Sequence, residues 1–309
     1  MSVKPNSMVA PPAKHHYVPQ FYQRGFISES SNRIWVYEKE REPRSFSPRK
    51  TGMKIALYGF TNSRGEFDTE TIEKELAKID SDGAKVIQKL ERGNPIKDQE
   101  RLSLCHFVSV MWRRTPKHKE QVEKAAAELM PKVFEGLDEE WLRRIVMVRA
   151  TSPAQAEQLF NREKEELERL REQYMKEVPD FLFAGNTVRD SNFEQIMYGM
   201  DWALFRAAPG TEFLTCDDPA FFNKGTGLKD REAVIMFPLS SGLFLQAMHI
   251  SNFGNGYHQL SPAEVERLNT YVVQNAYKQV YASRRLDWVS SLVNKEIGAL
   301  WRGSSRSGR

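Results

Sequence analysis

Two histidines, a glutamine and an arginine lie close together near the start of the chain, in the aromatic segment KHHYVPQFYQRGF. They are His15, His16, Gln20 and Arg24, and on a short helix opened by Pro19 the last two would share one face. An imidazole titrates near neutral pH and a guanidinium matches a phosphate bidentately, so one histidine could be an acid or base and Arg24 an anion clamp. Alternatively, the histidines cap the helix and Arg24 pairs with a buried carboxylate.

Two adjacent carboxylates, Asp217 and Asp218, follow a β-type run in the segment LTCDDP. Neighbouring side chains of a strand point to opposite faces, so both could bind one metal only if a turn lies between them. Asp217 is therefore a candidate orienting group or metal ligand. The alternative is ordinary turn chemistry before Pro219, in which an aspartate bonds its own backbone.

Basic residues gather in the segment MWRRTPKHK, where an apolar helix should end. The cluster contains Arg113, Arg114, Lys117 and Lys119, with His118 among them. It could be a patch that contacts nucleic-acid phosphates. It could equally be a set of cations at the negative end of a helix dipole, each contributing ~0.3–1 kcal/mol.

A second pair of carboxylates, Glu73 and Asp80, is spaced seven residues apart on an expected helix over residues 68–91. This spacing places both on one face beside the apolar stripe. They could act as acid and base, or hold a metal with a histidine from elsewhere. The alternative is a solvated flank of the helix, which is common for such residues.

The spacing of apolar residues predicts the helices and strands that must position these side chains, and together they indicate an α+β fold. Apolar residues at helical spacing indicate helices over residues 68–91 and 98–114, three more between 117 and 176, and a long one over 261–284. Four short β-type runs between residues 202 and 248 predict an antiparallel sheet of about 4–6 strands packed against the helices. The run EKEELERLREQ, with opposite charges three and four residues apart, predicts an exposed helical face.

These patterns predict a single α+β domain over residues 14–301 with a helical insertion over 117–190. Residues 1–13, rich in proline, and the tail 302–309 are expected to be disordered. The chain has no apolar stretch long enough for a signal peptide or a membrane span, which favours a cytoplasmic protein without a membrane partner. Cys105 and Cys216 each lie in an apolar run and are expected to be buried thiols.

Several segments together resemble domain-of-unknown-function family 4238. They are HHYVPQFYQRGF, RIWVYEK, FDTETIEKELAKID, MWRRTP, FLTCDDP, FPLSS and LNTYVVQNAYKQVYAS, which span the chain from His15 to about Ser283. The first is the most specific, although Gln23 stands where the family commonly has leucine, a departure expected to affect packing. The resemblance implies a common fold and a common site, and by analogy with accessory bacterial and phage-associated proteins it suggests phage defence or toxin action.

The sequence contains no P-loop, no GxGxxG after a strand, no HExxH, no CxxC pair and no GxSxG, so it identifies no cofactor or metal. From the polar clusters described above we expect a hydrolase, a nuclease that acts on nucleic-acid phosphodiesters. His15 or His16 would be the acid or base, Arg24 and the arginine cluster would hold phosphate, and Asp217 would orient the reacting groups. The alternative is a non-catalytic module that binds nucleic acid or a protein, with a purely structural histidine motif.

Overall fold

A computed structural model of the protein describes residues 13–28, 31–189, 192–223 and 227–302. The predictions of a disordered arm and a disordered tail therefore fall almost wholly outside the described residues. The helices are α1 (Gln20–Arg24), α2 (Thr71–Glu91), α3 (Asp98–Arg113), α4 (Pro116–Phe134), α5 (Glu139–Arg149), α6 (Pro153–Val188), α7 (Asn192–Tyr198), α8 (Pro262–Asn275), α9 (Asp287–Glu296) and α10 (Ala299–Arg302), with a 3-10 helix η1 (Pro48–Lys50).

The strands form two larger sheets and two two-stranded sheets, so the fold is α+β as predicted. A five-stranded sheet has the order β12-β7-β11-β10-β9 and is antiparallel except for the parallel pair β12 and β7. A four-stranded antiparallel sheet has the order β3-β2-β13-β8. Their strands are β2 (Ile34–Tyr37), β3 (Arg44–Phe46), β7 (Asp201–Arg206), β8 (Thr215–Cys216), β9 (Phe221–Phe222), β10 (Val234–Ser240), β11 (Leu243–Met248), β12 (Gly256–Gln259) and β13 (Val280–Ala282).

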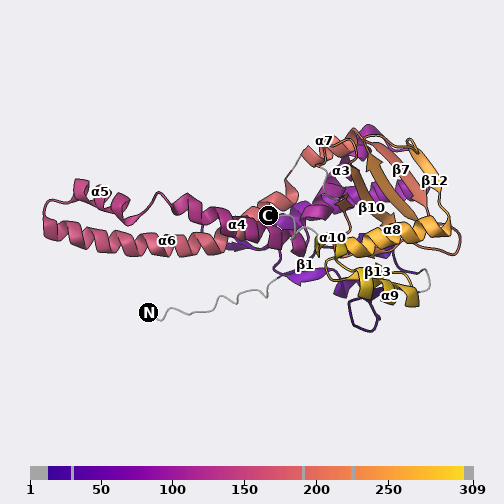
Figure 1. Ribbon diagram of the computed structural model, residues 1–309, viewed down its shortest axis with the longest axis horizontal. Coiled ribbons are helices and arrows are strands. Elements are labelled where there is room, and N and C mark those ends of the chain that lie inside the picture. The colour runs from indigo at the N-terminus through magenta and orange to yellow at the C-terminus, as the bar shows by residue number, and fades with distance from the viewer. Residues whose placement is uncertain (1–12, 29–30, 190–191, 224–226, 303–309) are drawn as a thin grey trace, which may run out of the picture.

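The five-stranded sheet is covered by helices on both faces. Successive side chains of a strand point to opposite faces of the sheet, and here both faces carry apolar side chains. Trp202 and Leu204 of β7 belong to the core that also contains residues of α2 and α3. Ala203 and Phe205 of the same strand belong to the opposite core, which contains residues of α8 and α9. Figure 1 shows α8 running across the sheet beside β10.

A long helical arm leaves this body over the residues for which a helical insertion was predicted. Figure 1 shows α4 and α5 lying along α6, which runs the whole length of the arm. With 36 residues, α6 is about 54 Å long at ~1.5 Å per residue. Glu165, Glu166 and Arg169 are exposed on it, as expected for a solvated face. No described helix is long and apolar enough to cross a membrane.

The structure corrects the helix predicted over residues 261–284. Its start is confirmed, because Ser261 and Glu264 form a capping box, but α8 ends at Asn275. The chain turns to an extended conformation at Ala276 and then forms β13 between β2 and β8. The reason is tertiary, since the Asp217 carboxylate accepts the N–H groups of residues 277–279 and Val280 pairs with Cys216 across the sheet.

A second correction concerns the strand at Thr215–Cys216, which was predicted to join the other strands between residues 202 and 248. It is β8, and it pairs with β13 in the four-stranded sheet. The tyrosine at position 22 contributes to this placement, because its hydroxyl bonds both the Thr215 hydroxyl at 2.8 Å and the Pro238 carbonyl at 2.7 Å. Tyr22 thus links β8 to β10 of the five-stranded sheet.

Candidate functional site

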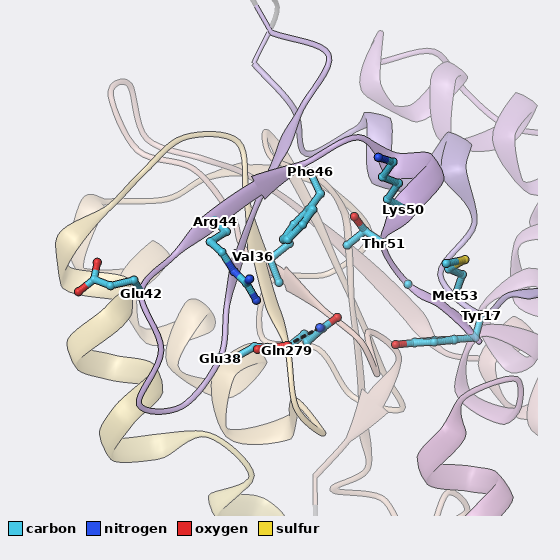
Figure 2. Close-up of a pocket in the computed structure, with 11 residues that line it drawn as sticks. Tyr17, Val36, Glu38, Glu42, Arg44, Phe46, Lys50, Thr51, Met53 and Gln279 are labelled. Atoms are coloured by element: carbon cyan, nitrogen blue, oxygen red, sulfur yellow. Dashed lines mark hydrogen bonds between the residues drawn. The ribbon is translucent and has the colours of Figure 1, made fainter. Parts of the chain in front are cut away.

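A polar pocket of about 180 Å³ lies where η1, β2 and β3 meet the N-terminal motif. Figure 2 shows the Arg44 side chain pointing toward Glu38 and Gln279, with Lys50 on the η1 side and the Tyr17 hydroxyl directed toward Gln279. This site is called the Tyr17 pocket below. Its lining residues are Tyr17, Val36, Glu38, Glu42, Arg44, Phe46, Lys50, Thr51, Gly52, Met53 and Gln279.

The backbone on either side of Tyr17 is held by Gly52. The N–H groups of Tyr17 and Val18 both donate to the Gly52 carbonyl, at 2.9 and 3.1 Å. This close approach needs glycine, because Gly52 has a φ of +59° and an added Cβ would lie 2.7 Å from that of Val18. The pairing of β1 (Lys14–His16) with β4 (Met53–Ile55) continues the same contact. The N-terminal motif and the segment after η1 therefore form one side of the pocket together.

Gln23 ties α1 to the same pocket wall. Its buried amide donates to the carbonyl of Val18 at 2.7 Å and to that of Thr51 at 2.9 Å. Thr51 lines the pocket, so Gln23 fixes a lining residue through its backbone. The departure from leucine at this position therefore adds specific hydrogen bonds in addition to its effect on packing.

Gln279 forms the floor of the pocket and is positioned by Asp217. The buried carboxylate of Asp217 accepts the N–H groups of Tyr277, Lys278 and Gln279 at 2.8, 2.8 and 3.1 Å. Burial raises the pKa of Asp217 to about 7, against the opposing effect of these three donors. Asp217 is thus a buried acceptor that shapes the turn before β13, and it does not line the pocket.

The Gln279 side chain is itself oriented by two neighbours. Its amide nitrogen donates to Glu38 Oε1 at 2.6 Å, and its amide oxygen accepts from the Tyr281 hydroxyl at 2.8 Å. The second oxygen of Glu38 accepts from Arg41 at 2.7 Å. Both oxygens of the Glu38 carboxylate therefore already have a donor.

The cations of the pocket outnumber its free anions. Glu38 is paired with Arg41, and the other acid of the rim, Glu42, lies 3.5 Å from Arg285. Arg44 and Lys50 are exposed, and within the described part of the chain neither forms an ion pair. Arg44 instead lies over the Phe46 ring, 5.5 Å from its centroid. Both acids of the pocket thus have a cationic neighbour outside it, whereas its two cations have no carboxylate partner within the described residues.

The two predicted catalytic histidines do not line this pocket. His15 is fully buried, stacks on the Tyr58 ring at 5.2 Å and accepts the Tyr58 N–H at Nδ1, 3.0 Å away. His16 is partly buried beside the backbone of Pro48 and Arg49. Burial lowers the pKa of both imidazoles, so both are neutral near pH 7. They pack the motif against η1 and against Tyr58.

Arg24 is separated from these groups. It is exposed at the end of α1, and among the described residues no hydrogen bond or ion pair joins it to His16 or Asp217. The structure therefore does not bring the predicted catalytic residues His15, His16, Arg24 and Asp217 into one cleft. Asp217 is connected to the Tyr17 pocket through the backbone of Gln279, and His16 through its chain neighbour Tyr17.

Arg114, predicted to contact nucleic acid, is only 1% exposed. Its guanidinium donates to Asp80 Oδ1 at 2.6 Å and to the His16 carbonyl at 2.8 Å. Burial opposes this charge, but Asp80 and Tyr58 raise the pKa of Arg114 above its ordinary value. Asp80 of the predicted carboxylate pair thus forms an ion pair with Arg114, and Glu73 feels the charge of the same arginine. Burial raises the pKa of both Asp80 and Glu73.

The rest of the predicted basic cluster is likewise tied to partners. Arg113 is buried, donates to the Asn186 carbonyl at 2.7 Å and lies 3.2 Å from Glu194. Lys117 forms a buried ion pair with Asp218, in which burial lowers the pKa of Lys117 and raises that of Asp218. Lys119 lies 2.6 Å from Asp180 of α6. These cations join the arm to the body, and none of them has its charge directed freely to solvent.

Sequence reasoning did not select the residues that line the pocket. Arg44 and Lys50 fall in a stretch rich in proline and serine that we interpreted as a loop, and Glu38 and Gln279 lie far apart in the chain. A concentration of basic residues was the available signal, since Arg44, Arg49, Lys50 and Lys54 occur within eleven positions. Among the described residues no group of three or more His, Cys, Asp or Glu is arranged to hold a metal ion.

Comparison with known proteins gives one match. No curated protein and no solved structure matches the chain. A family model described as "Protein of unknown function (DUF4238)" matches residues 14–285, which include the motif around Tyr17 and both carboxylates of the DDP turn. Because that match covers most of the chain, the protein belongs to the DUF4238 family.

Proposed function

We propose that this protein binds the phosphodiester backbone of a nucleic acid, with one phosphate group seated in the Tyr17 pocket. The observation that carries the proposal is the charge balance of the pocket. Glu38 and Glu42 are paired with Arg41 and Arg285, whereas Arg44 and Lys50 have no carboxylate partner among the described residues. A guanidinium and an ammonium group that share one pocket are suited to a phosphate.

The size of the pocket favours one group of a longer chain over a whole small molecule. Its volume of about 180 Å³ is below the ~300–1,000 Å³ of pockets that enclose drug-sized ligands. Further exposed cations, Arg49 and Lys54, lie next to the lining residues Lys50 and Met53 in the chain. They could contact the neighbouring phosphates of a bound strand.

Binding is better supported than hydrolysis by the same geometry. The Glu38 carboxylate is held in place by hydrogen bonds from Gln279 and Arg41, so it is oriented toward neighbours of the fold and is poorly placed to act as a general base. Burial also raises the pKa of Tyr17 well above its ordinary value, which makes the hydroxyl a weak acid. The nuclease hypothesis remains a proposal that the same experiment addresses.

The test is the fluorescence anisotropy of labelled single-stranded RNA and DNA of about 16 nucleotides, titrated with protein over a range of salt concentrations. Lys50→Gln and Arg44→Gln should each weaken binding and lower the slope of log affinity against log salt by about 0.7. The matched control is Lys132→Gln, which removes another exposed lysine, from α4 of the arm. It should bind as the wild type does.

Two results would overturn the proposal: no binding by the wild type at low salt, or pocket variants that bind with unchanged affinity and salt slope. Thermal unfolding of each variant shows whether the fold is retained, as expected for exposed positions. Electrophoresis of the same mixtures, with and without Mg²⁺ or Mn²⁺, tests for cleavage. If the wild type cleaves the strand and Lys50→Gln does not, the pocket is a nuclease site.

A further inference from the structure

The outer end of the helical arm has a core of its own. Leu142 and Val146 of α5 and Phe160 of α6 are buried against each other and form a cluster separate from the two cores of the body. Partly buried side chains of Trp141, Ala156 and Leu159 surround them. We call residues 139–160 the arm tip. So few buried side chains stabilise a helix pair only weakly, because helices owe most of their stability to the packing of an apolar face.

An apolar projection and an apolar pocket lie side by side on the arm tip. The side chains of Met147 and Val148 at the end of α5 are 68% and 87% exposed. Beside them is a pocket of about 410 Å³, and Met147 contributes to its wall. The remaining apolar lining comes from Val146, Ala150, Pro153, Ala156 and Phe160. This volume is large enough to accept side chains of a partner.

The charges around this surface are balanced. The arm tip contains three acidic residues, Glu139, Glu140 and Glu157, and three basic residues, Arg143, Arg144 and Arg149. Arg143 and Glu157 both line the pocket, with 3.8 Å between their charged groups, and each side chain is more than half exposed. A surface with one cation and one anion at its rim is complementary to an inverted copy of itself, and it offers no excess charge to a polyanion.

We infer that the arm tip binds the arm tip of a second copy of this chain. In a two-fold dimer the same surface patch of both protomers forms the interface. A patch that carries a projection beside a pocket can therefore place its projection in the partner's pocket and accept the partner's projection in its own. Met147 and Val148 of each protomer enter the pocket of the other. Arg143 and Glu157 then exchange partners across the interface. The inference does not depend on the proposed nucleic-acid binding, because the Tyr17 pocket lies in the body.

The dimer should be weak and dependent on concentration. The patch is confined to the end of α5 and the start of α6, so we expect the interface to be smaller than the ~800 Å² per partner of a standard stable interface. A dissociation constant of about 1 µM or weaker is the corresponding expectation. Sedimentation velocity of the full chain, from about 1 to 200 µM protein, should show the transition from monomer to dimer in this range.

The variant Val148→Asp tests the contact itself. It places a carboxylate in the interface and should weaken dimerisation at least about tenfold, with unchanged helix content by circular dichroism. The matched control is Val133→Asp, because Val133 is 66% exposed on α4 of the same arm but lies outside the tip. This control should dimerise as the wild type does.

Charge reversal supplies a second, independent test. Arg143→Glu alone should weaken the dimer by placing two acidic groups together, and the addition of Glu157→Arg should restore it. A wild type that stays monomeric at every concentration overturns the inference. So does a dimer that Val133→Asp dissociates while Val148→Asp does not.

Discussion

Replacement of Arg114 by methionine separates a structural cation from one that contacts a ligand. Methionine keeps most of the length of the side chain and removes its charge and hydrogen bonds. If Arg114 were part of an exposed phosphate-binding patch, the change would weaken binding without unfolding the protein. In the structure the side chain is only 1% exposed, so we expect the main effect on stability.

The expected loss of stability follows from the buried acceptors that lose their donor when Arg114 is replaced. Asp80 loses the donor 2.6 Å away, and the His16 carbonyl loses one at 2.8 Å. Burial already raises the pKa of Asp80 and Arg114 opposes that shift, so without the arginine the carboxylate is uncompensated. Removal of one partner of a buried ion pair typically costs about 3–5 kcal/mol. We expect the free energy of unfolding to fall by that amount.

Urea unfolding followed by tryptophan fluorescence measures this loss. The matched control is Arg24→Met, which makes the same substitution at an exposed arginine and should change stability by less than about 0.5 kcal/mol. Adding Asp80→Asn to Arg114→Met removes the uncompensated charge and should recover about 1–3 kcal/mol. The coupling identifies the pair as the source of the effect.

One outcome would refute this reasoning. If Arg114→Met unfolds within about 1 kcal/mol of the wild type while nucleic-acid binding falls, Arg114 is a ligand-binding residue and the buried network does not stabilise the fold. A loss of stability without recovery in the double variant would assign the effect to packing around Arg114 and not to its pairing with Asp80.

Two further predictions concern the N-terminal motif. Gly52→Ala should lower the free energy of unfolding by about 1–3 kcal/mol in urea titrations. The reason is that Gly52 has a φ of +59° and that the added Cβ would lie 2.7 Å from the Cβ of Val18. Gly136→Ala is the control and should leave the free energy of unfolding unchanged, because a Cβ at Gly136 meets no atom within 4 Å. Burial lowers the pKa of His15 from its ordinary 6.5, so its contribution to stability is present above that pH and is lost as the pH falls below it. Between about pH 7 and pH 5, His15→Asn should therefore lose less stability than the wild type, and equal slopes would contradict the assignment.

Local sequence signals were sufficient where an element depends on its own residues. The spacing on α2 predicted a buried stripe of Ile72, Leu76, Ile79, Val86, Ile87 and Leu90. All of these are buried except Ile79, which is half-buried, and Ser261 caps α8 as predicted. The exposed charges of α6 pair along the helix surface, as Glu166 and Arg169 do at 2.5 Å. Periodicity and capping are properties of a short segment, so the sequence alone carries them.

Elements that depend on distant partners were not predictable in this way. Residues 276–284 continue the helical pattern of α8, but they leave the helix because Asp217, about sixty positions earlier in the chain, accepts three of their N–H groups. The pocket floor depends on the same contact, since Gln279 reaches Glu38 across 241 positions of sequence. No local pattern encodes such a pairing.

The same division applies to the charges. The sequence determined that the chain has basic clusters near residues 44–54 and 113–119, because composition is local information. Only the tertiary structure decided which cluster is free to bind an anion. Arg114 and Lys117 meet the carboxylates of Asp80 and Asp218, 34 and 101 positions away, whereas Lys50 and Arg44 meet none among the described residues. A charge is available to a ligand only when no carboxylate of the fold already neutralises it, and long-range packing sets that condition.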